Sequence, residues 1–195
     1  MKKSIKLGTL ALALATIFTF SAKAQDTTPA PKSTTTSSGI KLSIGPEVGL
    51  PVGSLHDAYN WNLGSSIQAD IPVYANKLFV TVNASFNNFF AKDNNLGIAA
   101  KDLQLIPVKA GLKYFPVSNF YLQGEAGASF IADKDKVGAD KSASFVYAPQ
   151  VGYQFPLGGR NYLDAGVRFE GNTKFYNNGS SNNFLGLRVA YAFGL

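Results

Sequence analysis

The sequence contains no cysteine, one histidine and one tryptophan among its 195 residues. Without cysteine there are no disulfide bonds, and the lipid-modified N-terminal cysteine of a lipoprotein is excluded as well. After the N-terminal segment there is no run of about 20 apolar residues, so the sequence predicts no membrane-spanning helix. A membrane-embedded fold would therefore have to be a closed β-barrel.

Motifs that carry chemistry are equally scarce. The sequence has no Gly-rich phosphate loop, no nucleotide-binding fingerprint and no paired metal-ligand spacing. Four of the 18 basic residues (Lys2, Lys3, Lys6 and Lys23) lie near the N-terminus, which leaves 14 basic residues against 12 acidic ones. This near balance argues against a nucleic-acid partner, although the whole sequence has a pI of about 9.4. We expect no cofactor, no bound metal and no catalytic residue.

The N-terminus predicts export from the cytoplasm. Lys2, Lys3 and Lys6 precede an apolar run from Leu7 to Phe20, and small residues up to Ala24 form a cleavage site. The apolar run is too short to span a membrane. Residues 1–24 are therefore predicted to be a cleaved signal peptide.

Residues 25–39 are rich in Thr, Ser and Pro and show no apolar periodicity. This composition predicts a disordered leader between the signal peptide and the folded domain. Within it, Asp26-Thr27-Thr28 resembles the Asp-Thr-X signal for O-glycosylation in Bacteroidota, so that Thr27 or Thr28 is a candidate acceptor. A plain linker is the simpler interpretation.

The end of the chain, from Asn183 to Leu195, alternates between apolar and small or polar residues without a break. A period of two indicates a β-strand with unlike faces, and this segment is long enough to cross a bilayer when tilted, which takes roughly 9–11 residues. An apolar edge strand aggregates unless it pairs. We expect it to pair with the first strand of the same chain and to close a barrel. The apolar face contains Leu185, Leu187, Val189, Tyr191 and Phe193.

Residues 40–195 show this pattern repeatedly, as strand, long polar loop, strand and tight turn. The long loops begin near Gly53, Ala91, Ala132 and Gly171, and the short turns between them contain Pro, Gly and Asn. The repeat predicts an all-β fold, an eight-stranded antiparallel up-and-down transmembrane β-barrel with long loops at one end and short turns at the other. The fourth strand is irregular because Leu103 and Leu105 fall on the wrong parity, and a bulge near Leu105-Ile106 or Pro107 would restore the register.

Which face points outward must be argued separately, because a soluble barrel would hold its apolar set inside. The polar set is rich in Gly, which suits a narrow interior. It also holds every charged residue of the predicted strands, five of each sign, whereas Lys or Arg on the lipid face costs about 2–4 kcal/mol. We therefore predict that the polar set fills the lumen as a charge network. Its members are Lys41, Glu47, Asp70, Lys109, Lys113, Glu125, Asp164, Arg168, Glu170 and Arg188.

Aromatic residues gather near the predicted strand ends, as in the interfacial girdles of membrane barrels. The group beside the short turns is Tyr74, Phe79, Phe115, Phe120, Phe155 and Tyr162. The group beside the long loops is Trp61, Phe89, Phe90, Phe130, Phe145, Tyr176 and Phe184.

The segments from Gly45 to Gly53 and from Leu187 to Phe193 resemble the small outer-membrane β-barrel domain family common in Bacteroidota, which is related in shape to the OmpX, OmpW and OmpA barrels. The resemblance covers residues 40–195. It implies the outer membrane of a Gram-negative bacterium, with lipid, lipopolysaccharide and the barrel-assembly machinery as partners. The last strand is similar to the signal read by that machinery, carried here by Leu187, Val189, Tyr191 and Phe193.

One alternative function is enzymatic. His56 lies in the first long loop beside Ser54 and Asp57, and these residue types together suggest acyl transfer, as in a lipid A-modifying barrel. Adjacency in sequence is poor evidence for a spatial triad, so a solvated loop histidine is the preferred interpretation.

A second alternative is calcium binding by acidic residues in the third long loop, Asp133, Asp135 and Asp140. Lysines alternate with them, which favours a solvated loop tip. A narrow, porin-like channel for small solutes is a third alternative. The preferred function is a structural or surface-interaction role in the cell envelope, with an envelope protein as a further partner.

Overall fold

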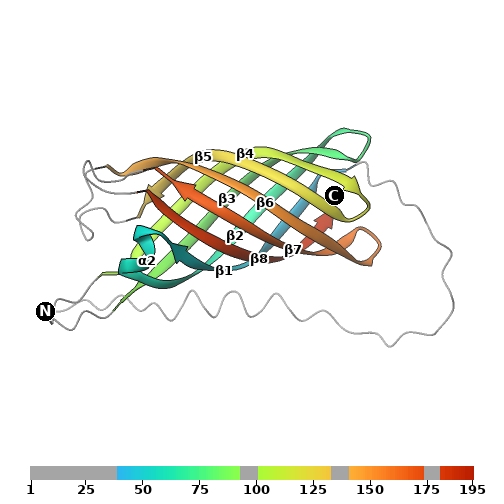
Figure 1. The fold of residues 1–195 in the computed structure, drawn as a ribbon. Helices are drawn as coiled ribbons and strands as arrows, with labels where there is room; N and C mark the ends of the chain where they lie inside the picture. The colour runs from blue at the N-terminus through green and yellow to red at the C-terminus, as the bar shows by residue number, and fades with distance from the viewer. Residues whose placement is uncertain (1–38, 93–100, 133–140, 174–180) are drawn as a thin grey trace, which may run out of the picture. The chain divides into compact units, whose positions relative to one another are not determined.

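The computed structural model describes residues 39–92, 101–132, 141–173 and 181–195, and the predicted signal peptide and nearly all of the leader lie outside this part. The described chain is a closed antiparallel barrel in which each of eight strands pairs with its neighbours in sequence (Figure 1). This confirms the predicted fold. The strands are β1 (Lys41–Val52), β2 (Tyr59–Tyr74), β3 (Leu78–Ala91), β4 (Leu103–Val117), β5 (Phe120–Ile131), β6 (Ala143–Gly158), β7 (Asn161–Asn172) and β8 (Asn182–Gly194).

The barrel closes through β1 and β8, which pair from Lys41↔Gly194 to Val52↔Asn183. The stagger of the strands follows from tracing paired residues once around the barrel. Starting at Leu42, the path returns to β1 at Val52, ten residues further along the strand. For eight strands this shear corresponds to a tilt of about 40°, as in membrane-spanning barrels.

The two faces of each strand carry different kinds of side chain, as the alternating sequence predicts. Large apolar side chains point outward and are exposed on all eight strands, whereas the polar partners point into the barrel and are buried. A soluble barrel with an apolar interior would need the opposite arrangement. Along β8, Leu185 and Leu187 are 47% and 46% exposed, while Arg188 and Ala190, which have the opposite parity, are each 1% exposed.

The three short turns lie together at one end of the barrel (Figure 1). Each contains residues with positive φ: Ala75 and Asn76 after β2, Asn119 after β4, and Gly158 and Gly159 at the end of β6. Gly and Asn tolerate this left-handed conformation, which lets a strand reverse within few residues. The N-terminus of β1 and the C-terminus of β8 lie at this same end.

The predicted bulge in the fourth strand is wrong. β4 pairs with β5 without a register shift from Leu105 to Tyr114, and its pairing with β3 keeps the same register. Leu103 and Leu105 instead point into the barrel, where they are 4% and 0% exposed. Their parity is therefore that of a regular strand whose interior face changes from charged to apolar near the loop end.

These leucines belong to an apolar cluster at the end opposite the short turns. A helix of five residues, α2 (Ser54–Ala58), follows β1 and contributes Leu55, which is 3% exposed. Phe89 and Phe184 pack edge to face within the cluster, with ring centroids 5.2 Å apart. The buried members are Leu55, Phe89, Leu103, Leu105, Ile131 and Phe184. Among the described residues, no helix has the length and apolarity needed to cross a membrane.

The predicted aromatic girdles are only partly correct. Phe79, Phe89 and Phe184 are about 1% exposed or less and lie inside the barrel. Phe115 and Tyr162 face a pocket at the short-turn end. Side chains that do lie on the outer surface near the strand ends include Trp61, Tyr74, Phe120, Phe130, Phe145 and Phe155. Tyr176 lies outside the described residues.

Candidate functional site

The interior of the barrel holds the charged residues of the described strands. All ten predicted lumen residues are buried, and none is more than 8% exposed. They come from six strands, with Lys41 and Glu47 on β1, Asp70 on β2, Lys109 and Lys113 on β4, Glu125 on β5, Asp164, Arg168 and Glu170 on β7, and Arg188 on β8. The alternation of each strand directs its charges inward, and the shear decides which charges meet.

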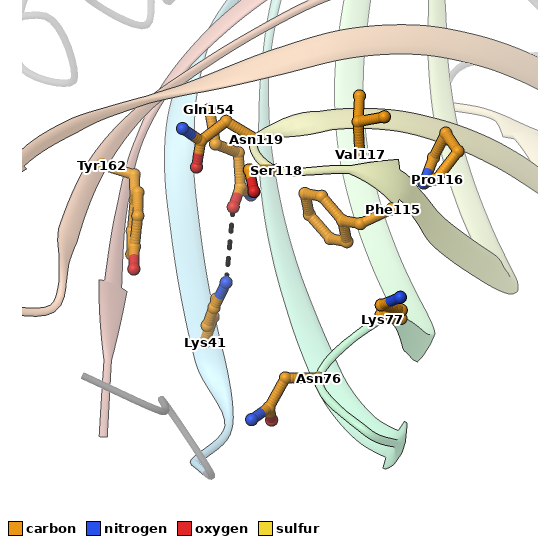
Figure 2. Close-up of a pocket in the computed structure, with 10 residues that line it drawn as sticks. All are labelled: Lys41, Asn76, Lys77, Phe115, Pro116, Val117, Ser118, Asn119, Gln154 and Tyr162. Carbon is orange, nitrogen blue, oxygen red and sulfur yellow. Dashed lines mark hydrogen bonds between the residues drawn. The ribbon is translucent and has the colours of Figure 1, made fainter. Parts of the chain in front are cut away.

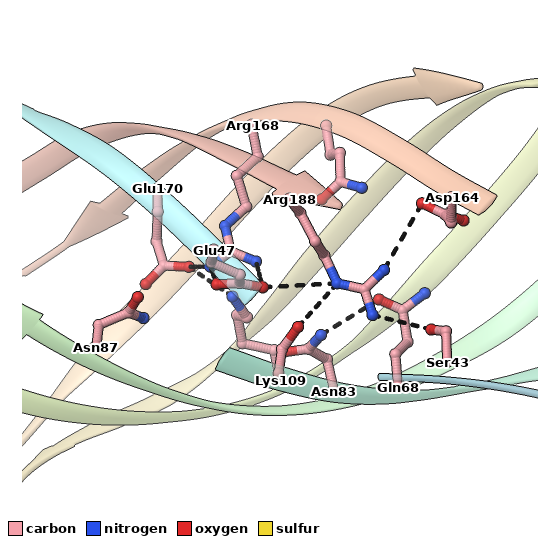
Figure 3. Close-up of polar contacts among 12 residues, drawn as sticks. Ser43, Glu47, Gln68, Asn83, Asn87, Lys109, Asp164, Arg168, Glu170 and Arg188 are labelled. Carbon is pink, nitrogen blue, oxygen red and sulfur yellow. Dashed lines mark hydrogen bonds and ion pairs between the residues drawn. The ribbon is translucent and has the colours of Figure 1, made fainter. Parts of the chain in front are cut away.

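Glu47 lies at the centre of the network, between two arginines (Figure 3). Arg168 binds both of its carboxylate oxygens, with Nη1 donating to Oε1 at 2.9 Å and Nη2 donating to Oε2. Arg188 Nε lies 3.6 Å from Oε1. The two-pronged contact matches the planar guanidinium to the carboxylate and fixes both side chains.

Arg188 bridges the network to two serines and a second carboxylate. Its Nε donates to Ser66 Oγ at 2.8 Å and its Nη2 donates to Ser43 Oγ at 2.9 Å. Its Nη1 lies 3.6 Å from Asp164 Oδ1. Arg188 on β8 therefore links β1 and β2, on one side of the closing seam, to β7 on the other side.

Lys109 and Lys113, four residues apart on β4, pair with different carboxylates. Lys109 Nζ lies 2.5 Å from Glu170 Oε2, and Arg168 lies 3.4 Å from the same oxygen. Lys113 Nζ donates to Asp70 Oδ2 at 2.7 Å and lies 3.4 Å from Asp164 Oδ2. A buried ion needs such partners because its desolvation is otherwise uncompensated.

Several uncharged side chains complete the coordination of Asp164. Tyr121 donates its hydroxyl proton to Oδ1 at 2.7 Å, and Gln154 Nε2 donates to Oδ2 at 2.8 Å. Gln150 Nε2 in turn donates to the Tyr121 hydroxyl at 2.6 Å. These three residues were not predicted as site residues, although they share the interior parity that identified the charges.

Two of the ten charged residues lack an ion pair in the described part of the chain. Glu125 accepts one hydrogen bond, from Thr81 Oγ1 at 3.0 Å, and its Oε2 has no partner. Lys41 donates one long hydrogen bond to Gln154 Oε1 at 3.4 Å. Its ammonium also lies over three aromatic rings, 5.0 Å from Phe79, 5.4 Å from Phe115 and 4.8 Å from Tyr162.

Lys41 lies at the inner wall of a pocket of about 550 Å³ at the short-turn end (Figure 2). Two of the short turns and the ends of several strands form the pocket. Its lining comprises Lys41, Asn76, Lys77, Phe115, Pro116, Val117, Ser118, Asn119, Gln154 and Tyr162. The lining holds two lysines and no acidic residue.

The predicted catalytic alternative gains no support from geometry. Ser54, His56 and Asp57 lie on α2 and are all exposed. The described contacts of His56 consist of a backbone bond from its N–H to the Gly53 carbonyl oxygen at 3.0 Å, and none links its ring to Ser54 or Asp57. Residues two apart on a helix do not face one another.

The candidate calcium ligands Asp133, Asp135 and Asp140 lie outside the described residues. Within the described residues, no group of three or more His, Cys, Asp or Glu side chains could hold a metal ion. The predicted assembly signal lies on the outer face of β8, where Leu187 and Tyr191 are exposed and Val189 and Phe193 are half-buried.

The arrangement places three layers along the interior. The short-turn end is an open pocket, the middle is a network of paired charges and amides, and the loop end is the apolar cluster under α2. The buried arginines are held by two or more partners each, so the chemistry of the middle layer is structural pairing. The exposed lining of the pocket is the part that a dissolved molecule can reach.

No protein-family profile matches the chain, and no curated protein matches it. Twelve solved chains have a similar fold. The outer membrane protein AlkL, solved in DMPC lipid bilayers, is 14% identical with a TM-score of 0.52, and the match covers 88% of this chain and 97% of AlkL. Neisserial surface protein A (NspA) is 17% identical with a TM-score of 0.53, over 80% and 95%.

Ail, the attachment invasion locus protein of Yersinia pestis, is likewise 17% identical with a TM-score of 0.50, over 80% of this chain and 99% of Ail. At these identities the likeness extends to the fold alone. It shows that the strand number and closed topology found here are shared with small barrels of bacterial surfaces.

Proposed function

We propose that this chain is an integral outer-membrane β-barrel protein with a structural or surface-interaction role. The observation that carries the proposal is the separation of its two faces. Every charged residue of the described strands is buried inside the barrel, while apolar side chains such as Ile67, Leu112 and Val167 are 57%, 52% and 51% exposed on the outside. In a lipid bilayer the apolar outer side chains contact acyl chains and the charged side chains stay inside the barrel, away from lipid, so this arrangement is favourable there.

The outer apolar band has a limit at the loop end. Asn88 and Gln104 on the outer face hydrogen-bond to each other at 3.1 Å, and Asn88 Nδ2 donates to Asp102 Oδ2 at 3.3 Å. Polar side chains belong at the headgroup level and not among acyl chains. This edge marks where the apolar band ends at the loop end. The proposed orientation, with the long loops outside the cell and the short turns in the periplasm, follows the usual asymmetry of outer-membrane barrels.

The proposed partners follow from the same surface. The outward face of β8, with Leu187, Val189, Tyr191 and Phe193, is the candidate for recognition by the barrel-assembly machinery. Lipid and lipopolysaccharide contact the apolar band. The loop end, including α2, is available to envelope proteins or surface ligands.

The filled interior supports a structural role over solute transport. Eight strands leave a lumen just wide enough for side chains. Here Arg188, Arg168 and Glu47 cross its middle, and the apolar cluster occupies its loop end. We expect no steady conductance when the purified protein is reconstituted in planar bilayers, whereas stepwise openings would favour the narrow channel.

Cell fractionation tests the proposal. The protein, expressed with its N-terminal segment in a Gram-negative host, is expected to sediment with the outer membrane and to require detergent for extraction. On a gel, the unboiled protein should migrate differently from the boiled one, because closed barrels resist unfolding by detergent. Recovery in the soluble periplasmic fraction without detergent would overturn the proposal.

A further inference from the structure

We infer that the pocket at the short-turn end binds a small anionic ligand with an apolar body. Its volume of about 550 Å³ is that of a small-molecule site, and such sites combine apolar walls with a few placed polar groups. Phe115, Pro116, Val117 and Tyr162 provide the apolar walls. Asn76, Ser118, Asn119 and Gln154 provide uncharged polar groups.

The charge of the pocket selects an anion. Lys41 and Lys77 both line it, and no carboxylate does. The described strands hold five buried cations. Four of them each contact at least one carboxylate, whereas Lys41 has no ion pair within the described chain. A buried ammonium gains from an oxyanion partner, and among the described residues Lys41 has none within ion-pair distance.

The aromatic rings hold the Lys41 ammonium in position for such a ligand. Phe79, Phe115 and Tyr162 surround Nζ at 4.8–5.4 Å, and the attraction between a cation and these rings restricts the side chain without using its N–H donors. One N–H is directed to Gln154 over 3.4 Å. The ammonium therefore has donors left for a phosphate or carboxylate oxygen.

Figure 2 shows how the lining is distributed around this ammonium. Lys41 lies between Tyr162 on one side and Phe115 on the other, and Asn76 and Lys77 lie on the turn at the mouth. An anionic group that reaches Lys41 would place its apolar part against Phe115 and Pro116. In the proposed orientation the ligand is a periplasmic solute, and only this choice of compartment rests on the proposed function.

The test is an NMR titration of the purified barrel in zwitterionic detergent micelles, following the backbone amides of Ser118 and Asn119. The probes are phenyl phosphate, inorganic phosphate and benzyl alcohol. We expect saturable shifts with phenyl phosphate, at an affinity at least fivefold higher than for either other probe, because only phenyl phosphate combines a charge with an apolar ring.

Two variants separate the pocket from nonspecific binding. Lys41→Met keeps most of the side-chain length and should lower the affinity for phenyl phosphate at least tenfold, and the exposed turn substitution Lys77→Met should lower it about threefold. Lys92→Met, a lysine next to β3 at the loop end, should leave it within twofold. If Lys41→Met does not fold, as judged by gel mobility without boiling, the affinity of Lys77→Met for phenyl phosphate provides the test instead.

Failure to observe saturable binding would overturn the inference. So would equal affinity for benzyl alcohol and phenyl phosphate, or an unchanged affinity for phenyl phosphate in folded Lys41→Met or in Lys77→Met. Because binding is measured on the purified protein, it is independent of where fractionation locates the chain. The binding result can therefore be interpreted even if the outer-membrane proposal fails.

Discussion

At the scale of single residues, the charged side chains of the interior differ greatly in how many partners each one contacts. Arg188 contacts Ser43, Ser66, Glu47 and Asp164, whereas Glu125 has one hydrogen bond. A buried ion with several partners is costly to remove, because the partners stay behind uncompensated. A buried ion with few partners contributes little to stability or opposes it.

Substitution of Arg188 by Leu is expected to lower the free energy of unfolding by about 3–5 kcal/mol, the usual cost of removing one member of a buried ion pair. Equilibrium unfolding in urea, from detergent micelles, measures it. The control is Lys101→Leu at an exposed position before β4, with an expected change within about 0.5 kcal/mol. Equal stability of the two variants would contradict the pairing.

Glu125→Gln and Glu47→Gln should differ, although both replace a buried carboxylate by an amide of the same shape. Glu47 is held by two arginines, so its neutralisation is expected to cost about 3 kcal/mol. Glu125 has no ion pair within the described chain, and its amide can still accept from Thr81, so the change should stay within about 1 kcal/mol. The same unfolding measurement ranks them, and the reverse order would contradict the assignment.

At the scale of elements, β4 shows how one strand serves three environments. Its outer face is apolar from Ile106 to Leu112, which is 52% exposed, while its inner face changes from Lys113 and Lys109 to Leu105 and Leu103. The last two residues pack in the apolar cluster at the loop end. The position along the barrel axis therefore decides what an inward side chain must be.

Leu105→Ala is expected to lower the free energy of unfolding by about 2–5 kcal/mol, because it leaves a cavity in a packed cluster. Leu112→Ala on the same strand is the matched control. Its side chain faces outward, where surrounding lipid or detergent can fill the space, so a loss of about 1 kcal/mol is expected. Chemical unfolding of both variants provides the comparison. A larger loss of unfolding free energy for Leu112→Ala than for Leu105→Ala would contradict the placement of Leu105 in the packed interior.

Two glycines on the neighbouring strands β4 and β5 give a second test at this scale, Gly111 on the inner face and Gly124 on the outer face. A Cβ on Gly111 would lie 2.0 Å from the Gly124 carbonyl oxygen on the neighbouring strand, whereas a Cβ on Gly124 meets nothing within 4 Å. Gly111→Ala should therefore destabilise the barrel by about 1–3 kcal/mol. Gly124→Ala should be neutral or slightly stabilising. Gel-shift melting temperatures would reveal the difference, and equal melting would count against the close strand approach.

At the scale of the whole molecule, closure and shear turn eight alternating strands into one interior. The path around the barrel that leads from Leu42 to Val52 sets which residues share a level. This is how Glu47 on β1 meets Arg168 on β7, 121 positions away in sequence. A slip of one residue in any strand would move its charges to the outer face.

Much of this architecture could be predicted from sequence because alternation is a local signal. It identified the eight strands and assigned Lys109 and Leu112 to opposite faces. The pairing of Lys109 with Glu170, and not with Asp164, depends on the shear, which no single strand encodes. Leu103 and Leu105 were misassigned because parity was taken to imply a single interior chemistry. The helix α2 and the pocket beside Lys41 arise only when distant segments come together.

The outward orientation of the apolar faces is tested most directly by spin-label accessibility along β8. The chain has no cysteine, so single cysteines can be introduced at successive positions from Leu185 to Ala192 and labelled with a nitroxide in lipid bilayers. We predict high collision rates with oxygen, which concentrates in lipid, at positions 185, 187, 189 and 191, and low rates at 186, 188, 190 and 192. A reversed alternation, or none, would contradict the account.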